Sequence, residues 1–111
     1  MRKFEWDEEK NFINKLKHNV SFEDAATVFE DTRVVTIYDE EHSDDEERFI
    51  VIGFDFKSRT LTVCHCYRGK NNDIIRIISA RKAAKHEIEL YKEENGILWK
   101  SNIQEKILKE A

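Results

Sequence analysis

The stretch Asp73–Ala83 restricts the fold of this chain more than any other part of the sequence. It contains four β-branched isoleucines, at positions 74, 75, 77 and 78. Arg76 is the polar side chain inside this run, and such a pattern is typical of a buried central strand. Ser79 can then cap a helix that begins near Ala80 and continues toward Glu94. The sequence therefore predicts a central strand that leads directly into a helix.

Two arginines flank this predicted junction. Arg76 lies in the strand and Arg81 lies in the expected first turn of the helix. Because guanidinium groups match the geometry of phosphate oxygens, we expect both side chains to point outward together and to form an anion-binding site. For Arg76, a salt bridge to an acidic loop or a solvated position on an exposed sheet face is the alternative.

The length and composition indicate a single packed domain. The chain has 111 residues, of which 40% are hydrophobic. No apolar run approaches the length of a membrane helix, and the N-terminus lacks the apolar core of a signal peptide. We therefore expect a cytoplasmic protein that does not contact a membrane.

The two cysteines do not form a metal site in this interpretation. Cys64 and Cys66 read as reduced, packed thiols in a strand. Because side chains alternate across a strand, both thiols are expected on one sheet face and His65 on the other. The three side chains cannot then converge on one ion, so we expect no metal and no cofactor.

The net charge of −4 conceals a strong separation of charges along the chain. Residues 39–47 hold seven acidic residues and no Lys or Arg. Residues 57–85 hold eight basic residues against Asp73 alone. Such a chain can present a basic site on one face and an acidic loop elsewhere.

Two helices are predicted before the sheet. Asp7 caps the first, and its apolar face is expected to consist of Phe12, Ile13 and Leu16. The second is short and begins after Ser21, which opens a capping box.

Most of the remaining chain reads as β-structure. After a short edge strand near the N-terminus, strands are predicted over residues 34–38, 48–54, 60–67 and 73–79. Their tight connections favour antiparallel neighbours. The expected fold class is α+β: two N-terminal helices, an antiparallel sheet of about four strands, and a helix packed on the sheet through Ala84, Ile88 and Tyr91. A last helix after Ser101 forms a C-terminal helical extension.

Several short strings occur in an order and at spacings that resemble a known family. They are Phe4–Asp7, Lys17–Phe22, His42–Ser43, Glu47–Phe49 with Ile52–Gly53, and Arg76–Arg81 followed by Glu87 and Tyr91. Together they cover roughly residues 2–93 and resemble the BrnT family of bacterial toxins. The resemblance implies a toxin domain of RelE-like ribonuclease fold in residues 1–94, followed by the extension in residues 95–111.

The resemblance also implies a function. Members of the BrnT family are toxins of type II toxin–antitoxin systems that arrest growth by cutting RNA. A BrnA antitoxin with a ribbon-helix-helix DNA-binding domain neutralises them. The expected partners are thus a BrnA-like antitoxin and an RNA substrate, with DNA contacted only through the antitoxin. The expected activity is that of a metal-independent endoribonuclease.

The sequence departs from the family pattern at three places. Asn19 stands where the family usually has Gly, which is a tolerable exchange in a left-handed helix cap. The turn from Lys70 to Asp73 is longer than usual, which changes only a loop. The stretch after Glu94 passes the usual end of the family, and its role stays open.

RNA cleavage without a metal requires a base for the 2′-OH, an acid for the leaving 5′ oxygen, and cations beside the phosphorane. We expect Arg48, Arg76 and Arg81 to supply the cations, and Glu47 ranks first as the base. His42, in the acidic loop, is a candidate for the acid. For Arg48 the alternative is a pair with a neighbouring glutamate.

Further residues are expected to follow the RNA backbone. They are Arg68, Lys70, Lys82, Lys85 and Tyr67. For the four basic residues, a solvated basic face is an equally good interpretation. Tyr67 could stack on a base, as in readers of single-stranded RNA, whereas Tyr91 is expected in the core.

A second interpretation assigns no catalysis at all. The sheet and the last helix would then form an interaction module that binds an antitoxin-like DNA-binding partner. RNA cleavage by substoichiometric protein distinguishes the two interpretations.

Overall fold

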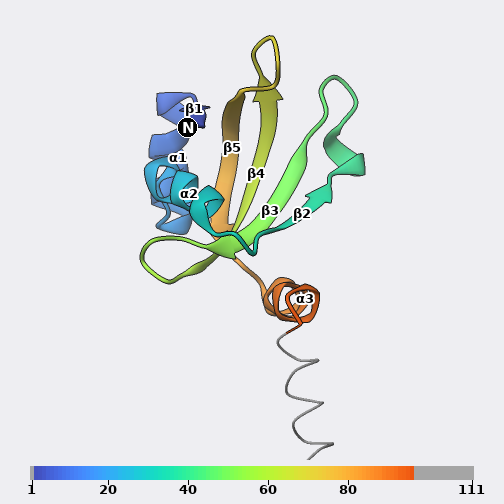
Figure 1. Cartoon of the computed structure of the whole chain (residues 1–111). Coiled ribbons are helices and arrows are strands. Elements are labelled where there is room, and N and C mark those ends of the chain that lie inside the picture. The colour runs from blue at the N-terminus through green and yellow to red at the C-terminus, as the bar shows by residue number, and fades with distance from the viewer. Residues whose placement is uncertain (1, 97–111) are drawn as a thin grey trace, which may run out of the picture.

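The computed structural model describes residues 2–96, which form a five-stranded sheet with helices on one face and at one end (Figure 1). The strands are β1 (Lys3–Glu5), β2 (Val35–Tyr38), β3 (Phe49–Phe54), β4 (Thr60–Arg68) and β5 (Ile74–Lys82), in the spatial order β1-β5-β4-β3-β2. β2, β3, β4 and β5 pair antiparallel in sequence order, whereas β1 pairs parallel with β5. The α+β class is confirmed, and the sheet of about four antiparallel strands is corrected to five strands with a parallel edge.

The parallel edge strand β1 pairs with a strand that is far from it in the sequence. Short turns force consecutive strands to be antiparallel, but β1 and β5 are separated by most of the domain and are free of this constraint. β1 lies beside the first half of β5, with Lys3 next to Ile74 and Glu5 next to Arg76. A rule that considers only sequential neighbours cannot predict this pair.

The strand β5 is longer than the sequence predicts, and the helix after it starts later. β5 pairs with β4 up to Lys82, and the N–H of Ala83 still donates to the carbonyl of Thr60 at 2.9 Å. The helix α3 therefore begins at Lys85. The prediction that Ser79 caps this helix is wrong, because the long pairing with β4 holds that residue inside the strand.

Helices α1 (Glu8–His18) and α2 (Phe22–Ala26), followed by the 3-10 turn η1 (Thr27–Glu30), pack against one face of the sheet, which we call the helix face (Figure 1). The predicted caps are present: Asp7 accepts from the N–H of Lys10 at 3.1 Å, and Ser21 accepts from the N–H of Asp24 at 3.0 Å. The core between these layers consists of Val20, Phe22, Ala25, Val28, Val51, Leu61, Val63, Ile75, Ile77 and Ala80.

Helix α1 packs in the opposite orientation from the one its sequence predicts. Its buried residues are Asn11 and Asn14, whereas the expected apolar face points to solvent. The side chain of Asn14 donates to the carbonyls of Val20 and Ala80 at 2.8 and 2.7 Å and accepts from the N–H of Ala80 at 3.2 Å. Asn11 accepts from the N–H of Phe22 at 2.8 Å. These bonds satisfy backbone groups that burial would otherwise leave unpaired, and periodicity cannot reveal them.

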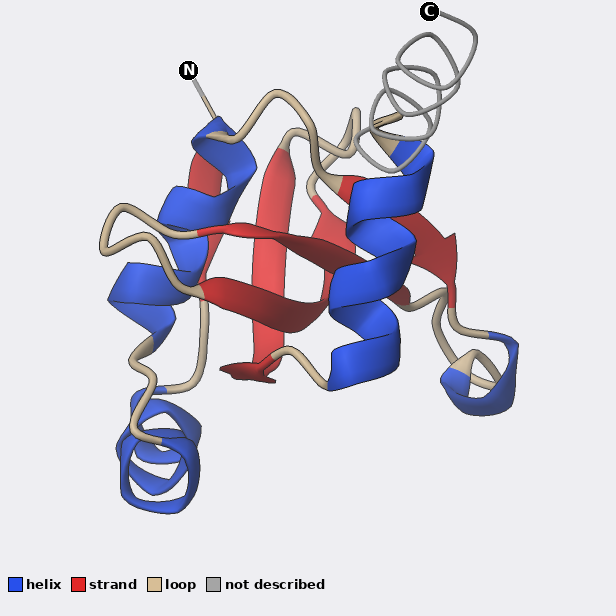
Figure 2. Ribbon diagram, turned by 90° about the horizontal axis from the view of Figure 1, so that it is seen from below, coloured by secondary structure: helices blue, strands red, loops and turns tan. Residues whose placement is uncertain are grey.

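Helix α3 (Lys85–Glu94) lies across the end of the sheet where β2 and β3 meet, as the view from below shows (Figure 2). Tyr91 is 3% exposed, as predicted for a core residue, and its ring meets that of Phe54 edge-on at 5.4 Å. Its hydroxyl donates to Asp31 at 2.8 Å. Burial, together with this bond to the carboxylate, raises the pKa of Tyr91 to about 12.

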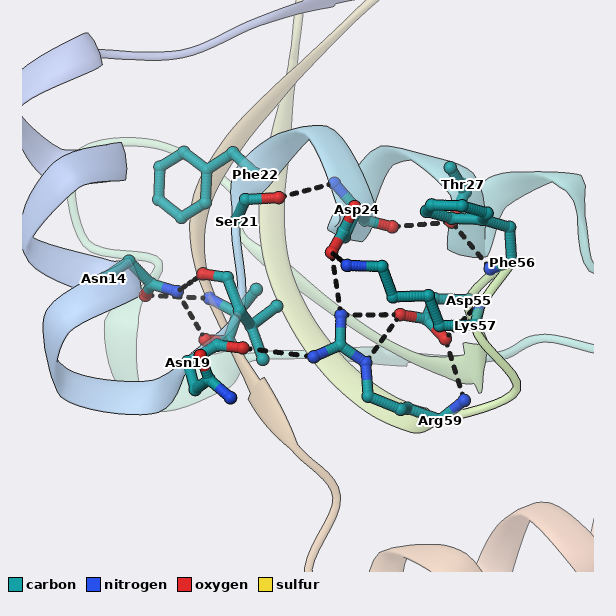
Figure 3. Close-up of polar contacts among 12 residues, drawn as sticks. Asn14, Asn19, Ser21, Phe22, Asp24, Thr27, Asp55, Phe56, Lys57 and Arg59 are labelled. Carbon is teal, nitrogen blue, oxygen red and sulfur yellow. Dashed lines mark hydrogen bonds and ion pairs between the residues drawn. The ribbon is translucent and has the colours of Figure 1, made fainter.

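A polar network ties the turn between β3 and β4 to the N-terminus of α2 (Figure 3). The guanidinium of Arg59 donates to Asp55 at 2.9 Å, to Asp24 at 2.9 Å and to the carbonyl of Asn19 at 3.0 Å. Asn19 has the left-handed conformation expected for it, with φ 58°. The network holds the end of α1 and the start of α2 against the sheet.

The predicted helix after Ser101 lies outside the described residues. None of the helices within residues 2–96 is long and apolar enough to cross a membrane.

The orientation of α1 can be tested by exchanging polarity on its two faces. The substitution Asn14→Leu makes the buried face more apolar, yet we expect it to lower the free energy of unfolding by about 2–4 kcal/mol, because it leaves buried backbone groups unpaired. The matched control Leu16→Asn, on the exposed face, should change that free energy by less than about 0.5 kcal/mol. Urea denaturation at equilibrium measures both, and the reverse ranking would contradict this orientation.

Candidate functional site

The sheet face that points away from α1 and α2 carries four arginines, and we call it the arginine face. They are Arg48, directly before β3, Arg68 at the end of β4, and Arg76 and Arg81 in β5. The buried residues Ile75 and Ile77 point to the helix face, so Arg76 between them points the other way.

A bulge in β5 brings Arg76 and Arg81 to the same face. In a regular strand, two residues that are five positions apart point to opposite faces. The pairing of β5 with β4, however, passes over Ile78, so the strand contains one extra residue at this point. The core residues Ile77 and Ala80 are accordingly three positions apart rather than two.

Three of the four arginines are held by carboxylates of the same chain. The pairs are Arg76 with Glu5 at 2.9 Å, Arg81 with Glu87 at 2.7 Å, and Arg68 with Glu46 at 3.0 Å. The prediction that Arg76 and Arg81 flank a strand–helix junction is therefore wrong. They share a face, but both lie in the strand and each is bound to a glutamate.

The carboxylates come from segments whose position the sequence did not predict. Glu5 reaches Arg76 because β1 pairs with β5 in parallel. Glu87 lies in the first turn of α3, where one of its oxygens also accepts from the N–H of Ala84 at 2.7 Å. Both contacts depend on the two features of the fold that differ from the prediction.

The pair of Arg81 and Glu87 is the more enclosed of these contacts. Glu87 is 8% exposed, and its two oxygens accept from the two terminal nitrogens of Arg81 at 2.7 and 3.0 Å. Burial alone would raise the pKa of Glu87, but the hydrogen bonds from Arg81 and from the N–H of Ala84 outweigh it and lower the pKa. The same hydrogen bond raises the pKa of Arg81. Both groups therefore stay charged at neutral pH.

Arg48 differs from the other three, because within residues 2–96 it forms no ion pair. It lines a depression of about 250 Å³ on the arginine face, which we call the Arg48–Arg81 depression. The lining residues are Asp39, His42, Arg48, Ile50, Thr62, Cys64, Ile78, Ser79 and Arg81. Two arginines thus line one depression, and one of them, Arg48, has no carboxylate partner among the described residues.

His42 stands at the rim of this depression in a defined orientation. It ends the 3-10 turn η2 (Glu40–His42), and its Nδ1 lies 3.0 and 3.2 Å from the two carboxylate oxygens of Asp39. The loop is fixed to β3, since the N–H of Asp39 donates to the carbonyl of Arg48 at 2.9 Å. A carboxylate on Nδ1 fixes the proton there and leaves Nε2 for a ligand, as in acid–base sites.

Glu47 does not lie with the arginines. Consecutive residues of an extended chain point to opposite sides, so Glu47 and Arg48 diverge. Glu47 lines a separate depression with Glu46, Phe49 and Tyr67, whereas Arg48 borders His42 and Arg81. The structure therefore does not bring the predicted base beside the predicted cations.

Tyr67 belongs to an aromatic cluster on the helix face. Its ring lies 5.2 Å from that of His65 and 5.4 Å from that of Phe49. His65 is 1% exposed, and among the described residues neither of its ring nitrogens has a hydrogen-bond partner; burial, with a smaller effect of Arg2, lowers its pKa to about 4. His65 is thus neutral at physiological pH, and Tyr67 lies on the opposite side of the sheet from the arginines.

The cysteines lie as predicted, on the face opposite His65. Cys64 lines the Arg48–Arg81 depression, and burial raises the pKa of the Cys64 and Cys66 thiols. Both are free, and groups with a raised pKa are poor nucleophiles at neutral pH.

The predicted lysines do not gather at one place. Lys70 lies in the turn between β4 and β5, at one end of the sheet, whereas Lys82 and Lys85 lie at the other end, where β5 leads into α3. All three are exposed. Only Lys82 and Lys85 are close in sequence to an arginine of the depression, Arg81.

The sequence interpretation named His42 but missed its pairing with Asp39. The signal was available, because Asp39 and His42 are three residues apart in one loop and such spacing allows a turn to bring their side chains together. The choice of Glu47 as the base ignored the alternation of side chains at the start of β3.

These features define a class: a small α+β protein whose sheet presents a cluster of arginines and an oriented histidine, which suits an anionic ligand. The comparisons with known proteins identify a family. A family model described as "Ribonuclease toxin, BrnT, of type II toxin-antitoxin system" matches residues 6–87. The chain belongs to this family, which confirms the predicted resemblance, and membership implies an antitoxin partner.

A solved structure shares the fold. The crystal structure of the Brucella abortus ribonuclease toxin BrnT matches with a TM-score of 0.55 and 23% sequence identity, over 77% of this chain and 100% of that one. No curated protein sequence matches.

The contribution of the Arg81–Glu87 pair can be measured through its pH dependence. The pKa of Glu87 is lower in the folded protein than its ordinary value of 4.5, so the stabilisation is present above pH 4.5 and is lost as the pH falls through the folded value. We expect Glu87→Gln to lower the free energy of unfolding by about 1 kcal/mol at pH 7, because Arg81 is partly solvated. The difference from the wild type should close in acid.

The exposed Glu89 on the same helix provides the control, since Glu89→Gln removes one charge without removing a bond from Arg81. Denaturant titrations between pH 3 and 7 compare the three proteins. If the difference in the free energy of unfolding between Glu87→Gln and the wild type did not depend on pH, the ion pair would contribute nothing to stability.

Proposed function

We propose that this protein is an endoribonuclease toxin that binds an RNA phosphate in the Arg48–Arg81 depression. The observation that carries the proposal is that Arg48, Arg81 and the Asp39-bound His42 line one depression. Membership of the BrnT ribonuclease toxin family supports the choice of RNA as the anion.

Arg48 is the first phosphate ligand in this proposal, because within residues 2–96 it has no carboxylate to displace. Arg81 is the second. Its side chain is 44% exposed even while it is bound to Glu87, so part of the guanidinium can still approach a ligand. Two guanidiniums on one phosphate would stabilise the additional negative charge of the phosphorane.

The reaction follows from the chemistry of RNA. The 2′-oxygen attacks the adjacent phosphorus and its proton passes to water, while the bond from phosphorus to the 5′ oxygen breaks. Protonated His42 gives its Nε2 proton to that leaving oxygen, and the products are a 2′,3′-cyclic phosphate and a 5′-hydroxyl. Because the nucleophile belongs to the substrate and the arginines and His42 supply the cations and the acid, this scheme assigns no step to a metal.

The rest of the arginine face would guide the RNA strand. Arg76 and Arg68 continue from the depression toward the turn that contains Lys70, and Lys82 and Lys85 extend it at the other end. Contacts of this kind contribute affinity without sequence preference. Tyr67 and Glu47 lie on the other side of the sheet and have no part in this path.

The same proposal includes a BrnA-like antitoxin of ribbon-helix-helix type in the cytoplasm. It would inhibit by placing acidic or apolar helical segments over the Arg48–Arg81 depression, and the chain would contact DNA only through it. The antitoxin would thereby compete with RNA for the guanidinium of Arg48.

One observation favours the alternative of a non-catalytic interaction module. Arg68, Arg76 and Arg81 are already neutralised by carboxylates of the chain, which leaves fewer charges for RNA than the sequence predicted. In that case the protein would bind the antitoxin without degrading RNA.

Cleavage of a labelled single-stranded RNA by the purified protein in the presence of EDTA tests the proposal. We expect Arg48→Ala to lower the cleavage rate by about 100-fold or more, and His42→Ala by a similar factor, since each removes a group that acts in the transition state. Arg33→Ala, an exposed arginine outside the depression, should leave the rate unchanged. Wild-type protein without cleavage, or full activity of both variants, would overturn the assignment.

A further inference from the structure

The outer face of α1 is an apolar surface without a partner among the described residues. Phe12, Ile13 and Leu16 are 60%, 42% and 73% exposed. Leu16 is four positions after Phe12 and three after Ile13, and residues at these spacings are neighbours on a helix surface, so the three side chains form one patch joined through Leu16. We call this patch the α1 patch. Single exposed apolar residues are ordinary, but three large ones together on one helix mark an interaction site.

The helix does not need these residues to stay in place. Its inner side is fixed by the hydrogen bonds of Asn11 and Asn14, and its ends are capped by Asp7 and Asn19. A chain that holds a helix with asparagines while it exposes Phe and Leu reverses the usual arrangement of a surface helix. Within residues 2–96 the α1 patch is therefore not needed to hold the helix against the sheet.

The charges around the α1 patch indicate the chemistry of the occupant. Lys10, Lys15 and Lys17 surround it and form no ion pair within residues 2–96. Of the two acidic residues of the helix, Glu8 accepts from the indole N–H of Trp6 at 2.7 Å, and Glu9 lies at the N-terminal edge of the patch, so the three lysines outnumber the one remaining carboxylate. A partner that covers the patch must therefore combine apolar side chains with carboxylates.

We propose that the α1 patch is a docking site for the antitoxin, which would cover it with an amphipathic helix that has an apolar stripe and acidic flanks. This inference rests on the proposed function only in that the partner is an antitoxin. Such helix-on-helix contacts are a common recognition mode. The patch lies on the far side of the sheet from the Arg48–Arg81 depression, so this contact anchors the partner without itself blocking the phosphate site.

A second copy of this chain is a weaker candidate for the occupant. The helix has 11 residues and is about 16 Å long. A symmetric contact between two such helices buries far less than the about 1,200–2,000 Å² of a stable interface. An antitoxin that also contacts another part of the toxin can add the missing area.

The test uses the full-length toxin and the purified antitoxin from the adjacent reading frame. We expect the double substitution Phe12→Glu with Leu16→Glu to weaken antitoxin binding at least 100-fold by titration calorimetry. The control is Phe56→Glu, which places the same charge on a side chain that is 66% exposed outside α1, and it should leave the affinity unchanged. Reversing Lys15 and Lys17 to Glu should also weaken binding, and the salt dependence of binding should decrease.

Three further measurements make the outcome decisive. The double variant should keep the wild-type melting temperature and the wild-type rate of RNA cleavage without antitoxin. Unchanged antitoxin affinity overturns the inference. So does a wild-type dimer that the substitutions convert to a monomer in light scattering, or a lowered melting temperature, which would show that the chain itself covers the patch. If the wild type cleaves no RNA, the proposed function fails, while the binding result still decides the α1 patch.

Discussion

The long pairing of β5 with β4 is the interaction on which the rest of the structure depends. It extends from Ile74 to Lys82 and includes the bulge at Ile78. The pairing buries Ile77 and Ala80 against the helices and, because of the bulge, turns Arg76 and Arg81 to the same opposite face. Without the extra residue, one of the two arginines would point into the core. The basic surface is thus a consequence of backbone pairing as much as of composition.

The arginine face is balanced rather than uniformly positive. Glu5, Glu46 and Glu87 each come from a different segment and hold one arginine in a fixed position. Such pairs leave Arg48 as the cation with the greatest freedom to bind an anion. They also explain how an acidic protein can carry a face rich in arginine, because these carboxylates hold the guanidiniums in place.

The sequence predicted those parts of the structure that depend on local chemistry. The caps at Asp7 and Ser21, the left-handed Asn19, the burial of Tyr91 and the two faces of the Cys64–Cys66 segment all follow from rules over a few residues. Family membership was also readable, because it rests on several ordered strings.

What the sequence did not predict depends on contacts between distant segments. The parallel edge strand, the extension of β5 past Ser79 and the inward position of Asn14 each require a partner more than 60 residues away or on another strand. The prediction of the site was limited in the same way, because its contacts also join distant segments. Arg76 and Arg81 could be named but not their glutamates, and Glu47 was placed beside the arginines wrongly because the direction of its side chain depends on where β3 begins.

Glu87 also links the Arg48–Arg81 depression to helix α3. One of its oxygens accepts hydrogen bonds from both Arg81 and the N–H of Ala84, where α3 begins. This oxygen therefore connects strand β5 to the start of helix α3. An anion that pulls Arg81 away from Glu87 would weaken the first turn of α3. Binding in the depression should then change the amide exchange rates at the start of this helix.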